Sequence, residues 1–69
     1  MPLTLASVGE VCNIRRIGGP DETRRFLENL GFVQGAEVTI VSKLGGNLIV
    51  NIKDSRVAIN QDMARHIMI

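Results

Sequence analysis

The sequence lacks tryptophan and tyrosine, and its 69 residues include only two phenylalanines, one cysteine and one histidine. Proline-rich peptides dock into grooves lined by aromatic side chains, and single-stranded nucleic acids stack their bases on such side chains. The shortage of aromatics therefore argues against both kinds of ligand. Because Cys12 is the only cysteine, no internal disulfide can form, and this indicates a reducing compartment.

Two further features are absent: a large net charge and a long apolar run. Eight basic and seven acidic residues leave a net charge of +1, which gives no strong field for nucleic acid or for an anionic membrane. The first residues do not have the basic start and apolar core of a signal peptide. No apolar stretch approaches the roughly 18 residues of a membrane helix. We expect one cytoplasmic domain, residues 1–69, without membrane insertion and without a nucleic-acid partner.

The glycines and the apolar residues together indicate a small, mainly β fold. Seven glycines divide the chain into short pieces, and 45% of the residues are hydrophobic. Alternating apolar residues, or short runs of them, predict five strands. Their approximate ranges are 10–17, 37–42, 48–52, 57–59 and 67–69. A bulge near Asn13 would reconcile the imperfect alternation of the first strand. A sheet this small avoids exposed edges best by closing on itself into a barrel.

Short helical pieces are expected between the strands. Residues 3–7 predict a turn or a helical lead-in. Pro20 and Asp21 suit the start of a helix over residues 21–30, whose apolar residues lie three and four apart. Gly31 then occupies the position that needs a left-handed backbone, and Phe32 is placed to fold back on the helix, as in a Schellman ending. Asn60 or Asp62 would cap one helical turn before the last strand.

The hairpin of residues 37–52 presents an apolar outer face. A three-residue loop, Leu44 to Gly46, would pair Ile40 with Val50 and would keep both strands' apolar residues on the core side. The same register leaves Val41, Leu44 and Ile49 facing outward on or beside the hairpin. Contiguous apolar patches tend to mark interfaces, so these three residues are the candidate partner-binding set.

Four arginines, expected near these three apolar residues, are secondary candidates for partner contacts. Arg15 and Arg16 are adjacent on an expected strand and would face opposite sides. Arg24 and Arg25 are adjacent on the expected helix, about 100° apart around its axis. They do not form one stripe, and a solvated surface remains the alternative interpretation.

The sequence offers no catalytic, cofactor or metal site. Cys12 and His66 are the only strong nucleophile and base, and nothing in their spacing brings them together. Cys12 is most simply a small core residue, and His66 is expected to be solvated because its parity is opposite to that of Ile67. The glycine pairs fit neither the dinucleotide nor the P-loop pattern. We therefore expect a non-catalytic protein.

In order and spacing the chain resembles the FeoA family. The resemblance runs along nearly the whole chain, and its most specific piece is the helix ending from Leu30 to Gly35 followed by an alternating strand. The other residues that carry it are Leu5, Gly9, Ile17 to Gly19, Arg24 to Leu27, Val38, Ile40, Ala58, Ile59, Ala64, Ile67 and Ile69. The resemblance implies an SH3-like barrel with one inserted helix and a partner, the ferrous iron permease FeoB.

Three hypotheses follow. The first is an accessory or regulatory protein of ferrous iron uptake that binds the cytosolic region of FeoB, with a homodimer as another use of the same apolar surface. The second is a metal-sensing or regulatory module like the C-terminal domain of iron-dependent repressors. That domain shares the SH3-like barrel that the resemblance implies. The third, nucleic-acid binding, is weakened by the balanced charge and the lack of stacking residues.

Overall fold

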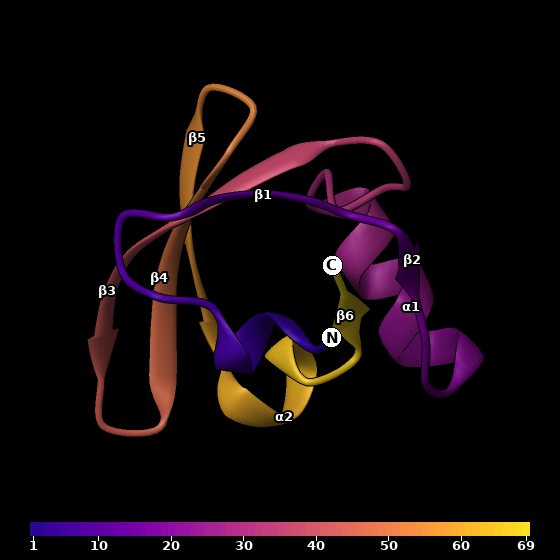
Figure 1. Ribbon diagram of the computed structural model, residues 1–69. Helices are drawn as coiled ribbons and strands as arrows, with labels where there is room; N and C mark the ends of the chain where they lie inside the picture. The colour runs from indigo at the N-terminus through magenta and orange to yellow at the C-terminus, as the bar shows by residue number, and fades with distance from the viewer.

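The computed structural model describes residues 1–69 and contains two antiparallel sheets around one core (Figure 1). The larger sheet has the order β1 (Val11–Asn13), β3 (Glu37–Leu44), β4 (Asn47–Ile52) and β5 (Ser55–Asn60). The smaller sheet pairs β2 (Arg16–Ile17) with β6 (Ile67–Met68). The helices are α1 (Asp21–Asn29), α2 (Gln61–Ala64) and a 3-10 turn, Leu3–Leu5, at the expected lead-in. The expected mainly β fold with one inserted helix and a helical turn before the last strand is confirmed.

The meander β3–β4–β5 supplies most of the core because its apolar residues alternate. Val38 and Ile40 of β3 are paired with Ile52 and Val50 of β4, and all four side chains are buried. Ile59 of β5 points to the same side and is also buried. This is the core register that the alternation predicts, and an error of one residue would turn the whole set to solvent.

Helix α1 ends in the Schellman geometry that Gly31 predicts. Gly31 has φ +107°, its N–H donates to the Glu28 carbonyl at 3.0 Å, and the Phe32 N–H donates to the Leu27 carbonyl at 3.0 Å. Phe32 and Leu27 are fully buried. Phe26, which the spacing also assigns to helix packing, is 48% exposed, so that assignment is wrong. Leu27 is the only buried residue within this helix of nine residues. The helix therefore packs on the core through Leu27 and through the buried Phe32 that follows its C-terminal end.

The first expected strand is divided between the two sheets. Its imperfect alternation predicts a bulge near Asn13, but β1 ends there and β2 pairs with β6 instead of β3. Between them, the Ile14 N–H donates to the Ala36 carbonyl at 2.9 Å, and the Arg15 N–H donates to the Met68 carbonyl at 2.7 Å. These two bonds belong to different sheets, so the chain turns a corner at residues 14–15. The interruption explains why five strands are expected and six are present.

The length of β5 differs from the expectation, whereas the helical cap after β5 agrees with it. The turn between β4 and β5 is Lys53–Asp54, and Lys53 has φ +54°. As a result β5 is longer than the expected strand 57–59. The expected cap of α2 is present, because the Asn60 Oδ1 accepts the Met63 N–H at 2.8 Å. Pro2 then bridges Met68, which brings the two ends of the chain together beside β6 (Figure 1).

Candidate interaction surfaces

The tip of the β3–β4 hairpin differs from the expected three-residue loop. The core pairs of Ile40 with Val50 and of Val38 with Ile52 are present, but the turn has two residues, Gly45 and Gly46, and Leu44 pairs with Asn47. A β-bulge between Ile40 and Ser42 absorbs the extra residue. In a bulge two residues oppose one on the partner strand, so Val41 and Ser42 together stand against Ile49.

The predicted apolar set therefore stays together on one hairpin. Val41 and Ile49 are half-buried, and Leu44 is 63% exposed at the hairpin end. The cross-strand register also adds a residue from a third strand. Val11 of β1 pairs with Thr39 of β3, directly before the bulge, and is 60% exposed. The hairpin surface, defined as Val11, Val41, Leu44 and Ile49, thus spans three adjacent strands.

Sequence reasoning missed Val11 because the first strand was expected to run on to Ile17. Its pairing with Thr39 follows only when β1 is known to join β3. The Leu3–Leu5 turn also approaches the hairpin, since the Lys43 Nζ donates to the Thr4 carbonyl at 3.3 Å, and it leaves Leu5 67% exposed. The signal in the sequence for an exposed Leu5 is its place directly before Ala6. When Ala6 is buried, the short helical turn directs the Leu5 side chain to solvent.

Arg16, Arg24 and Arg25 lie away from the hairpin surface, whereas Arg15 lines a depression together with Val11. Figure 1 shows β2 and α1 on one side of the molecule and the hairpin turn on the other. The arginines are therefore not neighbours of Val41, Leu44 and Ile49, contrary to the expectation. Their ion pairing also differs: Arg24 Nη2 contacts Asp21 Oδ1 at 2.6 Å within α1, and this is the only salt bridge of the structure.

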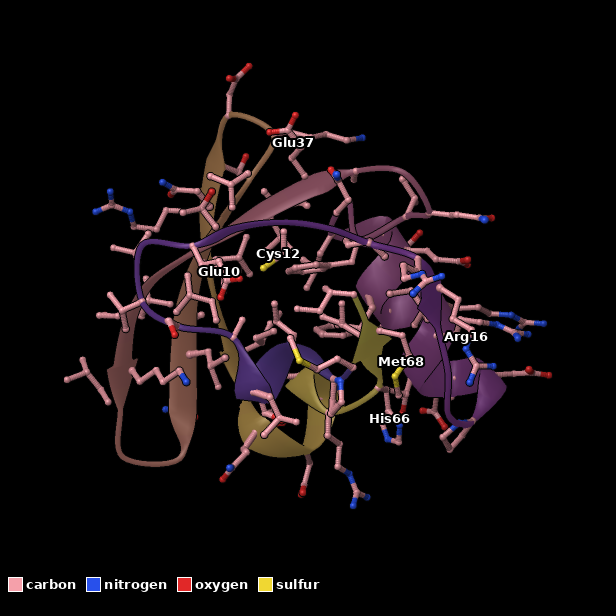
Figure 2. All side chains as sticks on the ribbon, viewed as in Figure 1. Glu10, Cys12, Arg16, Glu37, His66 and Met68 are labelled. Atoms are coloured by element: carbon pink, nitrogen blue, oxygen red, sulfur yellow. The ribbon has the colours of Figure 1, made fainter.

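Arg15 and Arg16 share one depression, although adjacent residues within a strand would face opposite sides. Both side chains are exposed, and both line one depression of about 640 Å³ together with Ile14, Gln34 and Met68. The alternation rule fails here because residues 14–15 form the corner between the sheets and not the middle of a strand. Figure 2 shows Arg16 extending outward on the α1 side of the molecule.

Cys12 and His66 are the two residues with possible nucleophilic or basic chemistry, and Cys12 is the more buried of the two. Cys12 is only 7% exposed, and its sulfur points from β1 toward the interior (Figure 2). Burial raises the pKa of the Cys12 thiol above its ordinary value, and the negative charge of Glu10 adds to the rise. A raised pKa favours the thiol over the reactive thiolate. Cys12 is thus a core residue, as expected.

His66 is half-buried and not solvated as its parity predicts. Its carbonyl accepts the Gly18 N–H at 2.8 Å, and its ring lies against Gly19. A Cβ at Gly19 would lie 2.8 Å from His66 Nδ1, so the absence of a side chain there makes room for the ring. The parity rule misses this contact because the Gly18–Gly19 turn folds over the side of β6 that would otherwise face solvent.

No three His, Cys, Asp or Glu side chains of the structure come close enough together to hold a metal ion. Neither α1 nor α2 has the length and apolar character that a membrane-spanning helix requires. Two surface features are available for contact with a partner: the hairpin surface and the depression beside Arg15 and Arg16.

Comparison with known proteins places this chain. Residues 1–69, the whole chain, match the FeoA domain family. The chain belongs to the FeoA family. FeoA proteins are non-catalytic accessory proteins associated with ferrous iron transport. Among curated proteins, no sequence matches this chain.

Solved structures agree with this FeoA assignment. The FeoA of Stenotrophomonas maltophilia, described as a zinc complex and an SH3 domain protein, is 27% identical with a TM-score of 0.87, over 99% of this chain and 87% of that one. Iron(II) transport protein A from Clostridium thermocellum is 26% identical with a TM-score of 0.92, over 99% of this chain and 43% of that one. The expected SH3-like fold is thereby confirmed.

The fold is shared more widely than the FeoA family. A manganese-dependent transcriptional repressor has a TM-score of 0.89 over 97% of this chain and 39% of its own, but only 17% sequence identity. At that identity the likeness shows the fold alone. It agrees with the barrel that the resemblance implies for repressor domains and does not extend metal sensing to this chain.

Proposed function

We propose that this FeoA-family chain is a cytoplasmic accessory protein that modulates ferrous iron uptake by binding the cytosolic region of a FeoB-type permease. Family membership supports the process, and the hairpin surface supports the mode of action. A protein of 69 residues without a catalytic constellation acts on a permease by contact. The observation that carries the proposal is the grouping of Val11, Val41, Leu44 and Ile49 on three adjacent strands.

Physical considerations favour a protein partner for this surface. The exposed side chains of Leu44 and Val11 gain about 25 cal/mol per Å² of apolar surface that a partner removes from water. Val41 and Ile49, already half-buried, form a firm base between them. The strands beneath are fixed by the buried residues of β3 and β4, so binding costs little ordering entropy.

The test measures binding of the purified protein to the FeoB cytosolic region, with a GTP analogue, with GDP and without nucleotide. The double variant Leu44→Gln, Ile49→Thr is expected to weaken binding at least tenfold, since interface hot-spot residues typically cost more than about 1 kcal/mol each. Val33→Gln is the matched control, because Val33 is an exposed apolar residue on the segment after α1.

Each result has a definite meaning. Binding that depends on nucleotide and is lost in the double variant supports a regulator of the permease. Undiminished binding and iron uptake in a folded double variant would exclude the hairpin surface. If the wild-type chain forms a dimer that the double variant abolishes, the surface joins two copies of the chain instead.

A further inference from the structure

The second surface feature is the depression at the corner between the two sheets. Its lining includes two exposed arginines, Arg15 and Arg16, and Gln34, but no Asp or Glu. Met1, which is 56% exposed, and the half-buried Met68 add apolar surface to this lining. A volume of about 640 Å³ lies within the roughly 300–1,000 Å³ typical of ligand sites.

Backbone hydrogen bonds hold both sides of this depression. On one side the Gly35 N–H donates to the Ile14 carbonyl at 2.8 Å and the Ile14 N–H donates to the Ala36 carbonyl, which fixes the segment after α1. On the other side the Arg15 N–H donates to Met68, and Arg16 pairs with Met68 across β2 and β6. The two arginines are therefore presented by a fixed backbone and not by a free loop.

Neither arginine has an acidic partner within the protein. The one salt bridge of the structure joins Arg24 to Asp21, which leaves the guanidinium groups of Arg15 and Arg16 available. Guanidinium binds carboxylate through two parallel hydrogen bonds, and such charge-assisted bonds are roughly twice as strong as neutral ones. Two adjacent guanidinium groups can therefore bind two carboxylates, or can both donate hydrogen bonds to one carboxylate.

We propose that this depression binds an acidic segment of a partner protein in which carboxylates alternate with apolar side chains. The apolar part of the lining distinguishes this occupant from a nucleic acid: the adaptable thioethers of Met1 and Met68 suit a leucine or valine between two acidic residues. The net charge of +1 gives no general field that would hold a polyanion. Arg15 also lines a second depression together with Val11 of the hairpin surface, so one partner could reach both surfaces.

The test uses the full chain labelled with ¹⁵N and a synthetic peptide of alternating leucine and aspartate, followed by amide chemical shifts. We expect shifts at Arg15, Arg16, Gln34 and Gly35, and none with the peptide in which asparagine replaces aspartate. The double variant Arg15→Gln, Arg16→Gln should weaken binding roughly tenfold or more, because it removes charge-assisted bonds. The matched control Arg24→Gln, Arg25→Gln removes the same charge from α1 and should change the affinity less than about twofold.

Three outcomes would overturn the proposal. The first is equal weakening by both double variants, which would reduce binding to non-specific charge. The second is that inorganic phosphate or a single-stranded oligonucleotide shifts the same amides at lower concentration than the peptide. The third is the absence of shifts in this depression. The map of shifted amides on the unmodified protein decides the last point even if the Arg15 and Arg16 variant does not fold.

Discussion

The two sheets of this protein are built on different physical principles. In the four-stranded sheet, β3 and β4 are long enough for side-chain alternation to fix the register, and their inward residues are all buried. In the two-stranded sheet, β2 and β6 have two residues each. There the structure depends on backbone hydrogen bonds at the corner, on the Schellman ending of α1 and on the contact of Gly19 with His66.

The difference decides how each half presents its surface. On the larger sheet a partner would meet side chains whose direction follows from a regular strand, apart from the bulge at Val41. On the smaller sheet the direction of Arg15 and Arg16 follows from a corner that no periodicity describes. Changes in side-chain volume should therefore damage the shared core most, whereas changes in backbone freedom should damage the smaller sheet selectively.

The largest expected effect separates the two phenylalanines. Phe32→Ala removes a fully buried side chain from the core and should lower the free energy of unfolding by about 3–5 kcal/mol. Phe26→Ala changes a side chain that is half in solvent and should cost less than about 1 kcal/mol. Urea unfolding of the two variants measures this difference. Similar costs would mean that α1 packs through Phe26 as well, contrary to the structure.

The next effect compares glycines from the two halves. Gly19 and Gly9 have nearly the same φ, +87° and +88°, but a Cβ at Gly9 would meet nothing within 4 Å. Gly9→Ala should cost about 1–2 kcal/mol for the left-handed backbone alone. Gly19→Ala should cost roughly 0.5–1.5 kcal/mol more, because the His66 ring must leave its preferred rotamer.

A double-mutant cycle isolates the contact between Gly19 and His66. In a His66→Ala background the extra cost of Gly19→Ala should disappear, and its effect should equal that of Gly9→Ala. Thermal and urea unfolding of the four proteins supply the cycle. An extra cost that persists without the imidazole would show that backbone strain, and not the ring, makes glycine necessary at this position.

Sequence reasoning was most successful where one strong preference acted alone. Alternation placed Val38, Ile40, Val50 and Ile52 in the core, and the Gly31 ending of α1 and the Asn60 cap of α2 were both expected. It failed where two preferences competed. The core demanded one register for β3 and β4, whereas Gly45 and Gly46 favoured a two-residue turn, and the bulge at Val41 satisfies both.

The remaining failures concern contacts made at a distance. The corner at Ile14 exists because the segment after α1 and the strand β6 each pair with the chain there, and neither partner is near in sequence. The depression that Arg15 and Arg16 share follows from that corner, and the contact of His66 with Gly18 and Gly19 follows from that turn. Periodicity within one segment carries no information about such pairings.

The smallest expected effect tests the core side of β1 through Cys12. Because burial, together with Glu10, raises the pKa of this thiol in the folded protein, the neutral thiol contributes stability that is complete below the thiol's ordinary pKa. As the pH rises past that ordinary value, the unfolded chain loses its thiol proton first, and the free energy of unfolding should fall until the folded thiol also ionises.

Cys12→Ala should abolish this alkaline decline while adding a constant cavity cost. All other ionisable groups are common to both proteins, so the difference between their urea unfolding curves from pH 7 to pH 10.5 isolates the thiol. Equal declines of the free energy of unfolding in the two proteins would mean that Cys12 is exposed to solvent and that β1 does not pack on the core of the larger sheet.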